Sequence, residues 1–394
     1  MMNKNYKVAV VGSGTSGLLT ASLLSMSSPI SVDVYHDPTI APLSVGEGAN
    51  YSLVDLIKTR AFFSTKDLEK TLNGTKKLGI KKVDWAGTGE FMHEFLMGNY
   101  SMHFDSALLR EYLKNTMNHK VNFIEGNVID KSNIDADFIY DCSGFPSEIN
   151  EEEFNILDSI PVNCSYVVQC NWEKPRFEYT LCEAMPEGWV FMIPLQNRCS
   201  VGYIHNSGIS SKEKIKDGIK EILEKYNLTQ NEDGNFLDFK NYTRKETFTW
   251  NHAWGGNASF FMEPLEATTL GNAIVMAREA VHVVADSGYV DPINKKYKKI
   301  MDGTEDMIAF HYFVGSKYNT DFWKMAKEKA TKRLMDSVDK PSLLKMIQTI
   351  SKKQLTPVKP PKDAYFEYGT WPIDSWAQNI EGFQALDKLK SLIK

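Results

Sequence analysis

Three glycines near the N-terminus have the types and spacing of a phosphate-binding turn. Gly12, Gly14 and Gly17 form the pattern GxGxxG within the segment GSGTSG. Such glycines let the chain turn tightly and let its backbone approach a pyrophosphate, whose charge then faces a helix N-terminus. The motif is weak by itself, because any glycine-rich turn between a strand and a helix can imitate it. The chemistry it predicts is the binding of a dinucleotide.

The residues around these glycines supply the elements that the motif requires. Lys7–Val11 is a continuous apolar run, which is typical of a strand buried on both faces. An apolar helix is expected over residues 18–26, and a second strand over Val32–Tyr35. This order predicts an α/β dinucleotide-binding fold. An acidic group that contacts a ribose is expected at the end of the second strand, where either His36 or Asp37 is the candidate.

The rest of the chain predicts further helices and a second kind of sheet. Between Asp158 and His205 several short alternating segments predict an antiparallel sheet inserted into the first fold. After Thr269 the pattern is almost entirely helical, with a proline-rich link from Thr356. The other expected elements are helices over Ser52–Leu72, Ser106–Met117 and Lys212–Tyr226 and strands over Lys77–Trp85 and Ile139–Phe145.

Composition excludes several classes of protein. The 394 residues are 42% hydrophobic, which is typical of a globular protein. Their net charge of −5 argues against a nucleic-acid binder, which needs a basic surface. Five cysteines lack the spacing of a metal site and are expected to be reduced thiols in the cytoplasm. No apolar run approaches the roughly 18–20 residues that a membrane span needs. We therefore expect a cytoplasmic enzyme with no metal, no nucleic-acid partner and no membrane partner.

Three further segments carry a resemblance to a known family. They are SVGEG at Ser44–Gly48, WVFMIP at Trp189–Pro194 and FMEPLEATT at Phe261–Thr269. Together with GSGTSG and DCSGF, they resemble the flavin-dependent halogenases, specifically the tryptophan-halogenase branch. Weaker similarity continues through MHFDSALLREYL and SVGYIHNS to about residue 325.

The resemblance implies a fold and a cofactor. The fold is an α/β, FAD-binding GR2-type Rossmann-like fold with an inserted antiparallel sheet and a C-terminal helical subdomain. Residues 1–285 would form the FAD-binding domain, with the insert at about 158–205, and residues 286–394 a mainly helical substrate-capping subdomain. The chain has one GxGxxG motif, so the reduced FAD is expected from a separate flavin reductase. The implied FAD contacts are Gly12, Gly14, Gly17, His36 or Asp37, Gly46, Glu47, Gly48, Asp141, Gly144 and Asn257.

The resemblance also implies a reaction and two catalytic residues. In this family reduced FAD, oxygen and a halide give hypohalous acid, which reaches an aromatic substrate through a tunnel. Lys77 matches the lysine that activates this oxidant, and Glu266 matches the glutamate that assists it and removes the ring proton. Period-two spacing would place Lys77 on one strand face with Val83 and Trp85. The alternatives are that Lys76, Lys77, Lys81 and Lys82 are ordinary solvated lysines, or that Lys76 is the true match through a one-residue slip.

Two more sites follow from the resemblance. The halide would bind the backbone amides of Thr268 and Thr269, where the family usually has glycine at the second position, so chloride, bromide and iodide all stay open. Trp189, Phe191, Ile193 and Pro194 would keep organic substrates away from the flavin. The alternatives are that Glu266 is a helix-start acid and that Trp189 and Phe191 are plain core residues.

Two other functions compete with a halogenase. An FAD-dependent aromatic monooxygenase would share the fold, and a non-catalytic flavoprotein would give no oxygen-dependent product. The expected substrate is a small electron-rich or indole-type aromatic molecule. The sequence leaves open a homo-oligomer, the identity of the substrate and whether the substrate is free or attached to a carrier.

Overall fold

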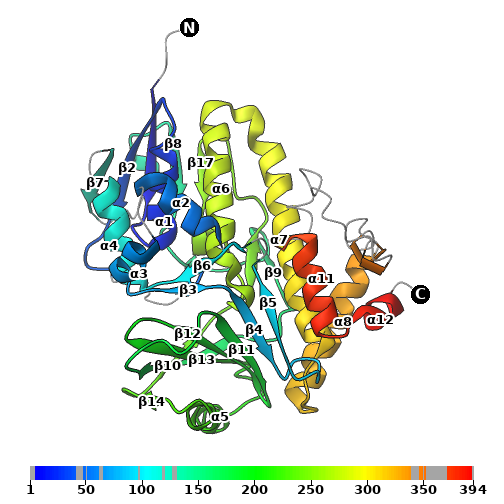
Figure 1. Ribbon diagram of the computed structural model, residues 1–394. Coiled ribbons are helices and arrows are strands. Elements are labelled where there is room, and N and C mark those ends of the chain that lie inside the picture. The colour runs from blue at the N-terminus through cyan, green and yellow to red at the C-terminus, as the bar shows by residue number, and fades with distance from the viewer. Residues whose placement is uncertain are drawn as a thin grey trace. The chain divides into compact units, whose positions relative to one another are not determined.

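A computed structural model describes residues 5–40, 48–49, 51–61, 65–95, 98–117, 120–126, 131–338, 346–348, 350–351 and 371–392. The chain divides into two compact units, each assembled from segments that are far apart in sequence (Figure 1). The first unit comprises Met1–Gly74, Phe104–Ile156 and Tyr242–Lys298, and the second comprises Thr75–His103, Leu157–Asn241 and Lys299–Lys394. The division of the chain at residue 285 remains a prediction. The predicted proline-rich link lies outside the described residues.

The first unit is built on a five-stranded parallel sheet, in the order β17-β8-β1-β2-β7. Val8 and Val10 of the central strand are fully buried, as expected for a strand covered on both faces. Strand order reverses at β1, since β2 lies on one side of it and β8 on the other. Ligands of such sheets bind at this switch point, beyond the carboxyl ends of the strands. The strands are β1 (Tyr6–Val11), β2 (Ile30–His36), β7 (Val121–Glu125), β8 (Phe138–Asp141) and β17 (His252–Trp254).

Helices cover this sheet. Helix α1 packs against α4 and α6 (Figure 1), and Leu18 and Leu19 of α1 are buried. The helix predicted over Ser106–Met117 is confirmed, and the one predicted over 52–72 is two helices, α2 and α3. The helices are α1 (Thr15–Leu24), α2 (Tyr51–Ala61), α3 (Thr65–Thr71), α4 (Ser106–Met117) and α6 (Thr268–Ala285). A small antiparallel sheet adds β9 (Phe154–Ile156), β16 (Tyr242–Arg244) and β18 (Phe260–Phe261).

The second unit is built on an eight-stranded sheet. Its main path runs β14-β10-β13-β12-β11-β4-β5, and β15 pairs with β10. All neighbours are antiparallel except β11 and β4. A separate antiparallel pair joins β3 (Thr75–Lys77) to β6 (Ser101–His103). The sheet strands are β4 (Gly79–Val83), β5 (Glu90–Glu94), β10 (Cys164–Asn171), β11 (Thr180–Met185), β12 (Gly188–Pro194), β13 (Arg198–His205), β14 (Thr229–Gln230) and β15 (Asn235–Asp238).

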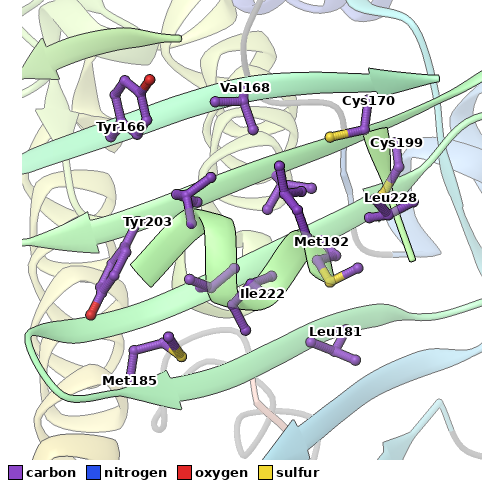
Figure 2. Close-up of a cluster of buried hydrophobic side chains, with 14 of the residues drawn as sticks. Tyr166, Val168, Cys170, Leu181, Met185, Met192, Cys199, Tyr203, Ile222 and Leu228 are labelled. Carbon is purple, nitrogen blue, oxygen red and sulfur yellow. The ribbon is translucent and has the colours of Figure 1, made fainter. Parts of the chain in front are cut away.

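One face of this sheet packs on the amphipathic helix α5 (Lys212–Lys225). Figure 2 shows Tyr166, Met192 and Tyr203 from the strands gathered with Ile222 of the helix in a single buried cluster. In strand β12, Val190 and Met192 belong to this cluster, whereas Trp189 and Phe191 alternate with them and do not. The apolar face of β12 that contains Trp189 therefore packs against a different neighbour.

That neighbour is α7. The indole N–H of Trp189 donates to the hydroxyl of Tyr312 on α7 over 3.1 Å. The remaining helices of this unit are α8 (Asp321–Val338), α11 (Ile373–Gly382) and α12 (Leu386–Ser391), and α7 spans Val290–Val314. The predicted fold class, a parallel α/β core with an inserted antiparallel sheet and a helical C-terminal region, is confirmed.

The single strand predicted over Lys77–Trp85 is wrong. Strand β3 ends at Lys77, Leu78 is exposed, and β4 begins at Gly79. Val83 belongs to the cluster that packs on α5, whereas the Trp85 ring lies 6.3 Å from the Trp189 ring. Asp84 between them has a φ of 62°, so the simple alternation stops there and Val83 and Trp85 do not share a face.

Candidate functional site

In the first unit, the glycine turn has the shape that a pyrophosphate requires. Gly12 has a φ of +106°, and a Cβ built on it would lie 2.3 Å from the carbonyl oxygen of Cys142. A Cβ on Gly17 would lie 2.0 Å from the carbonyl oxygen of Gly12. A Cβ on Gly14 would have no described atom within 4 Å. The first and third glycines are thus required by packing, and the second leaves space at the N-terminus of α1, where phosphate charge is favoured.

Asp141 and Gly144 follow β8, at the same carboxyl edge of the sheet. Asp141 is buried and its carboxylate accepts a hydrogen bond from the backbone N–H of Ser143 over 3.0 Å. The ammonium of Lys131 donates to the other carboxylate oxygen and to the Ser143 hydroxyl, over 3.2 Å in the second case. Gly144 has a φ of +106°. Lys131 belongs to no motif and could not be predicted at this edge from the sequence.

The segment that contains Asn257 reaches this edge from β17. The backbone N–H of Gly255 donates to the carbonyl oxygen of Asp141 over 2.8 Å. Gly256 has a φ of +57°, and a Cβ on it would lie 2.6 Å from the hydroxyl oxygen of Ser16 in α1. The structure therefore brings the predicted segments at Gly12–Gly17, Asp141–Gly144 and Asn257 together at one edge.

His36 and Asp37 both stand at the carboxyl end of β2. One oxygen of the Asp37 carboxylate accepts hydrogen bonds from the hydroxyl and the backbone N–H of Thr39, at 2.6 and 2.8 Å. These bonds lower the pKa of that carboxyl below its ordinary value, so it is ionised at neutral pH. The ring of His36 makes an edge contact with Phe123 at 6.2 Å. The choice between His36 and Asp37 as the ribose contact stays a prediction.

Gly46 and Glu47 lie outside the described residues, while Gly48 is described and partly exposed. Their roles as FAD contacts remain predictions. The described edge nevertheless fits FAD, because it offers a glycine cradle, an uncapped helix N-terminus and a carboxylate at β2.

Glu266 lies in a strained turn of the first unit. It has φ 66° and ψ 5°, and the next residue, Ala267, has φ 52° and ψ 45°. Left-handed backbone at a non-glycine residue costs roughly 1–2 kcal/mol each. The Glu266 side chain is 8% exposed. The turn places a buried carboxylate just before a helix start, which is compatible with both the catalytic and the helix-start interpretation.

Helix α6 begins at Thr268, close to the start of the helical region that was predicted after Thr269. The first amides of an 18-residue helix have no partners within it, and amides at a helix start can bind an anion without charged side chains. The Thr268 side chain is buried, and within the described part of the chain its hydroxyl has no hydrogen-bond partner. The halide role of Thr268 and Thr269 remains a prediction.

In the second unit, Lys77 is the buried lysine of β3. It is 1% exposed and pairs in register with Ser101 of β6, whereas Lys76 points to the other face and is half-buried. Its ammonium lies 5.8 Å from the centre of the Phe95 ring. The interpretation of Lys77 as an ordinary solvated lysine is therefore wrong. The one-residue slip to Lys76 would exchange a buried amine for a half-exposed one.

A buried histidine lies in the same two-stranded sheet. His103 pairs in register with Thr75, and its Nδ1 is 2.9 Å from the Thr75 hydroxyl oxygen. Its Nε2 is 2.8 Å from the hydroxyl oxygen of Thr180 in β11. Burial, and then the charge of Lys77, hold the pKa of His103 well below its usual value. The sequence placed His103 in a segment of weak resemblance and gave it no role.

The WVFMIP segment forms β12. Trp189 is 1% exposed, and Phe191 and Ile193 are partly exposed on the same side of the strand. The carbonyl oxygen of Pro194 accepts a hydrogen bond from the Thr75 hydroxyl over 2.7 Å. This segment thus ends against the strand of Lys77, while its place relative to FAD stays a prediction.

The burial of a second lysine was not predicted from the sequence. Lys82 of β4 is 1% exposed, and its ammonium lies 3.0 Å from Nε2 of His311 in α7. The His311 ring lies 5.7 Å from the Trp85 ring and 5.3 Å from the Trp371 ring. The preceding residue, Lys81, pairs with Glu90 at the surface. The sequence does not distinguish the two lysines, because the burial of Lys82 depends on contacts with distant parts of the chain.

Comparison with known proteins identifies the family. The family model described as "Tryptophan halogenase" matches residues 7–111 and 96–382. The chain belongs to this family. Its function class is accordingly that of a flavin-dependent halogenase, an enzyme with an FAD cofactor.

Individual relatives are distant but cover most of the chain. A tryptophan 6-halogenase, ThaL of Streptomyces albogriseolus, is 23% identical over 86% of this chain and 81% of its own. A tryptophan 7-halogenase, RebH of Lentzea aerocolonigenes, is 22% identical over 83% and 80%. Among solved structures, BrvH, a flavin-dependent halogenase from Brevundimonas, has a TM-score of 0.78 at 18% identity, covering 99% of this chain and 94% of that one.

No helix within the described ranges is long and apolar enough to cross a membrane. A hollow on α8 is lined by Lys324, Lys327, Thr331 and Lys332 together with Glu328, Met335 and Asp336. It contains none of the predicted site residues.

Proposed function

We propose that the protein halogenates an electron-rich, indole-type aromatic substrate and that Lys77 activates the halogenating agent. The observation that carries this proposal is the burial of Lys77. A buried ammonium beside an aromatic ring and a neutral histidine can present its N–H groups to a small polar molecule with little competition from water.

The chemistry that bound, reduced FAD supplies is the oxidation of a halide by oxygen to hypohalous acid. Lys77 would donate a hydrogen bond or a proton to the oxygen of this acid, making the halogen a better electrophile. As the carbon–halogen bond forms, the oxygen–halogen bond breaks, and the oxygen takes a proton from the Lys77 ammonium and leaves as water. Glu266 would accept the proton that the aromatic ring then loses, and its negative charge would stabilise the cationic ring before that step.

The remaining residues would bind and separate. The backbone N–H groups of Thr268 and Thr269 would hold chloride, bromide or iodide at the start of α6. Trp189, Phe191, Ile193 and Pro194 would keep the organic substrate away from the flavin, since β12 presents bulky side chains on one face.

The partners of the enzyme follow from the same proposal. A separate flavin reductase would deliver reduced FAD, and the protein would act on a small free or carrier-bound aromatic molecule, as a monomer or a homo-oligomer. All five cysteines are free thiols, which supports a reducing, cytoplasmic environment.

A bromination assay tests the proposal. The protein is supplied with FAD, an NADH-driven flavin reductase, oxygen and sodium bromide, over a panel of indoles and phenols together with 1,3,5-trimethoxybenzene as a very electron-rich trap. Mass spectrometry detects the bromine isotope doublet in each product. Lys77→Met removes the amine, and Lys76→Met is the matched control on the opposite, half-buried face of the same strand.

We expect brominated product from the wild type and from Lys76→Met, and none above background from Lys77→Met. Bromination of the trap but not of the indoles by Lys77→Met would also support a directing role for Lys77. Equal loss in both variants would contradict that role. Oxygenated products without bromine would identify an aromatic monooxygenase, and neither product with FAD bound would identify a non-catalytic flavoprotein.

A further inference from the structure

We propose that His103 is a positioning residue for Lys77, held in one neutral tautomer by a chain of hydrogen bonds that fixes the strand on which Lys77 lies. The proposal rests on the proposed function in so far as Lys77 is the catalytic lysine. The structural part of it, that His103 determines the placement of the Lys77 ammonium, stands without that assumption.

The tautomer follows from the direction of the hydrogen bonds. The carbonyl oxygen of Pro194 can only accept, so the Thr75 hydroxyl uses its single proton on that bond. Thr75 must then accept from His103, which places a proton on Nδ1. Nε2 is left with a lone pair and accepts the hydroxyl proton of Thr180. The chain runs from Thr180 through His103 and Thr75 to Pro194, and every member is satisfied while the imidazole is neutral.

This chain determines where Lys77 lies because β3 is so short. It contains three residues, and Thr75 and Lys77 are its two buried members on one face. The hydrogen bond that Thr75 donates to Pro194 of β12, and the one that His103 accepts from Thr180 of β11, attach the two-stranded sheet to the larger sheet. Because Lys77 lies two residues from Thr75 in the same short strand, these bonds also determine the position of Lys77.

To position Lys77, His103 must be neutral as well as correctly placed. After burial itself, the charge of Lys77 in the paired strand is what lowers the pKa of His103. The imidazole is fully buried. A protonated His103 would place a second cation beside the Lys77 ammonium in a medium where like charges repel strongly. A histidine that stays neutral supplies a donor and an acceptor without that repulsion.

Lysine-selective 15N NMR tests the placement without any assay of activity. The buried ammonium groups of Lys77 and Lys82 should give slowly exchanging signals, which Lys77→Met and Lys82→Met assign. We expect His103→Asn to shift or broaden the Lys77 signal and to leave the Lys82 signal unchanged. An unchanged Lys77 signal, or equal changes in both signals, would overturn the proposal.

A gentler pair of variants guards against misfolding and links placement to reaction. Thr180→Val keeps the shape of the side chain and removes the proton donated to His103, and Thr180→Ser restores a hydroxyl. In the bromination assay, we expect Thr180→Val to lower the ratio of brominated indole to brominated trap by about 10- to 100-fold. Thr180→Ser should restore most of that ratio.

The outcomes distinguish the two proposals. A ratio that is the same in Thr180→Val and the wild type would overturn the positioning role of His103. Wild-type protein that brominates nothing, with the NMR result as expected, would overturn the proposed function and leave the placement of Lys77 by His103 intact.

Discussion

The protein buries two lysines in neighbouring strands of the same unit, in very different surroundings. Among the described residues, Lys77 and Lys82 are the lysines with buried side chains, and each is 1% exposed. Lys77 lies in a two-stranded sheet with Thr75, Ser101 and His103, all of them polar and buried. Lys82 contacts His311 from a cluster of aromatic rings. Equal burial therefore does not mean equal function.

The two lysines also differ in how their histidines are held. His311 donates from Nδ1 to the carbonyl oxygen of Met307, one turn earlier in α7, over 2.9 Å. Its Nε2 must then accept from the Lys82 ammonium, so this pair is a cross-link between β4 and α7. His103 instead bonds to two threonines of its own unit, Thr75 and Thr180. We infer that the Lys82–His311 pair fixes the fold, whereas His103 positions the strand that contains Lys77.

Exchanging the two lysines for methionine should give opposite results, and this is the largest expected effect. Lys77→Met should lower the rate of indole bromination by at least about 100-fold, because the proton donor is lost. Lys82→Met should retain most of the bromination rate and lower the free energy of unfolding by about 1.5–3 kcal/mol, because a buried charged hydrogen bond is lost. Steady-state rates and urea unfolding of both variants provide the measurements. Similar profiles for the two variants would remove the distinction.

Changing the partner of Lys82 should reproduce the stability loss without touching a lysine. In His311→Phe the ring stays aromatic and the acceptor for the ammonium disappears. We expect the free energy of unfolding to fall by about 1–3 kcal/mol, because a buried ammonium loses a hydrogen bond. His311→Gln, which can offer an acceptor of its own, should lose less. If His311→Phe were as stable as the wild type, the cross-link would be structurally unimportant.

His103, in the strand paired with that of Lys77, should affect how the free energy of unfolding depends on pH. The pKa of His103 is lowered in the folded state, whereas an unfolded histidine has a pKa of about 6.5. Below that pH the unfolded chain binds the proton and the folded chain does not, so acidification favours unfolding. In His103→Asn this contribution is absent, and the free energy of unfolding should fall less steeply as pH decreases.

The slope difference can reach about 1.4 kcal/mol per pH unit, below about pH 6.5 and above the folded-state pKa. Urea unfolding of both proteins at about pH 7, 6 and 5 measures it. His205 and His252, whose pKa values burial also lowers, contribute equally to both proteins and cancel in the difference. Parallel curves for the two proteins would show that His103 is not held neutral by its surroundings.

Much of the first unit could be predicted from the sequence because its signals are local. The run Lys7–Val11, the glycines after it and the amphipathic helix Ser106–Met117 each specify an element through neighbouring residues, and all three are present. The segments at Asp141 and Asn257 could be assigned to the same edge only through the family resemblance. No local pattern identified Lys131 there.

The second unit was harder to predict, because its buried polar groups are determined by distant contacts. The sequence predicts one strand over Lys77–Trp85 and leaves open whether the lysines of this segment are solvated. Its division at Leu78 and the burial of Lys82 depend on pairing with β6, β5 and β11, which come from other parts of the chain. Likewise, His103 acquires its role from Thr180 and Pro194, far along the sequence.

Replacement of Lys81, the more exposed neighbour of Lys82, should give the smallest effect. Lys81 alternates with Lys82 on β4, its side chain is 25% exposed, and its ammonium lies 2.9 Å from the Glu90 carboxylate, whose side chain is 61% exposed. Such pairs contribute about 0–1 kcal/mol, since water and salt screen them. We expect Lys81→Met to change the free energy of unfolding by less than about 1 kcal/mol and to leave the bromination rate unchanged. A loss as large as that of Lys82→Met would mean that position on β4, rather than burial of the charge, determines the cost.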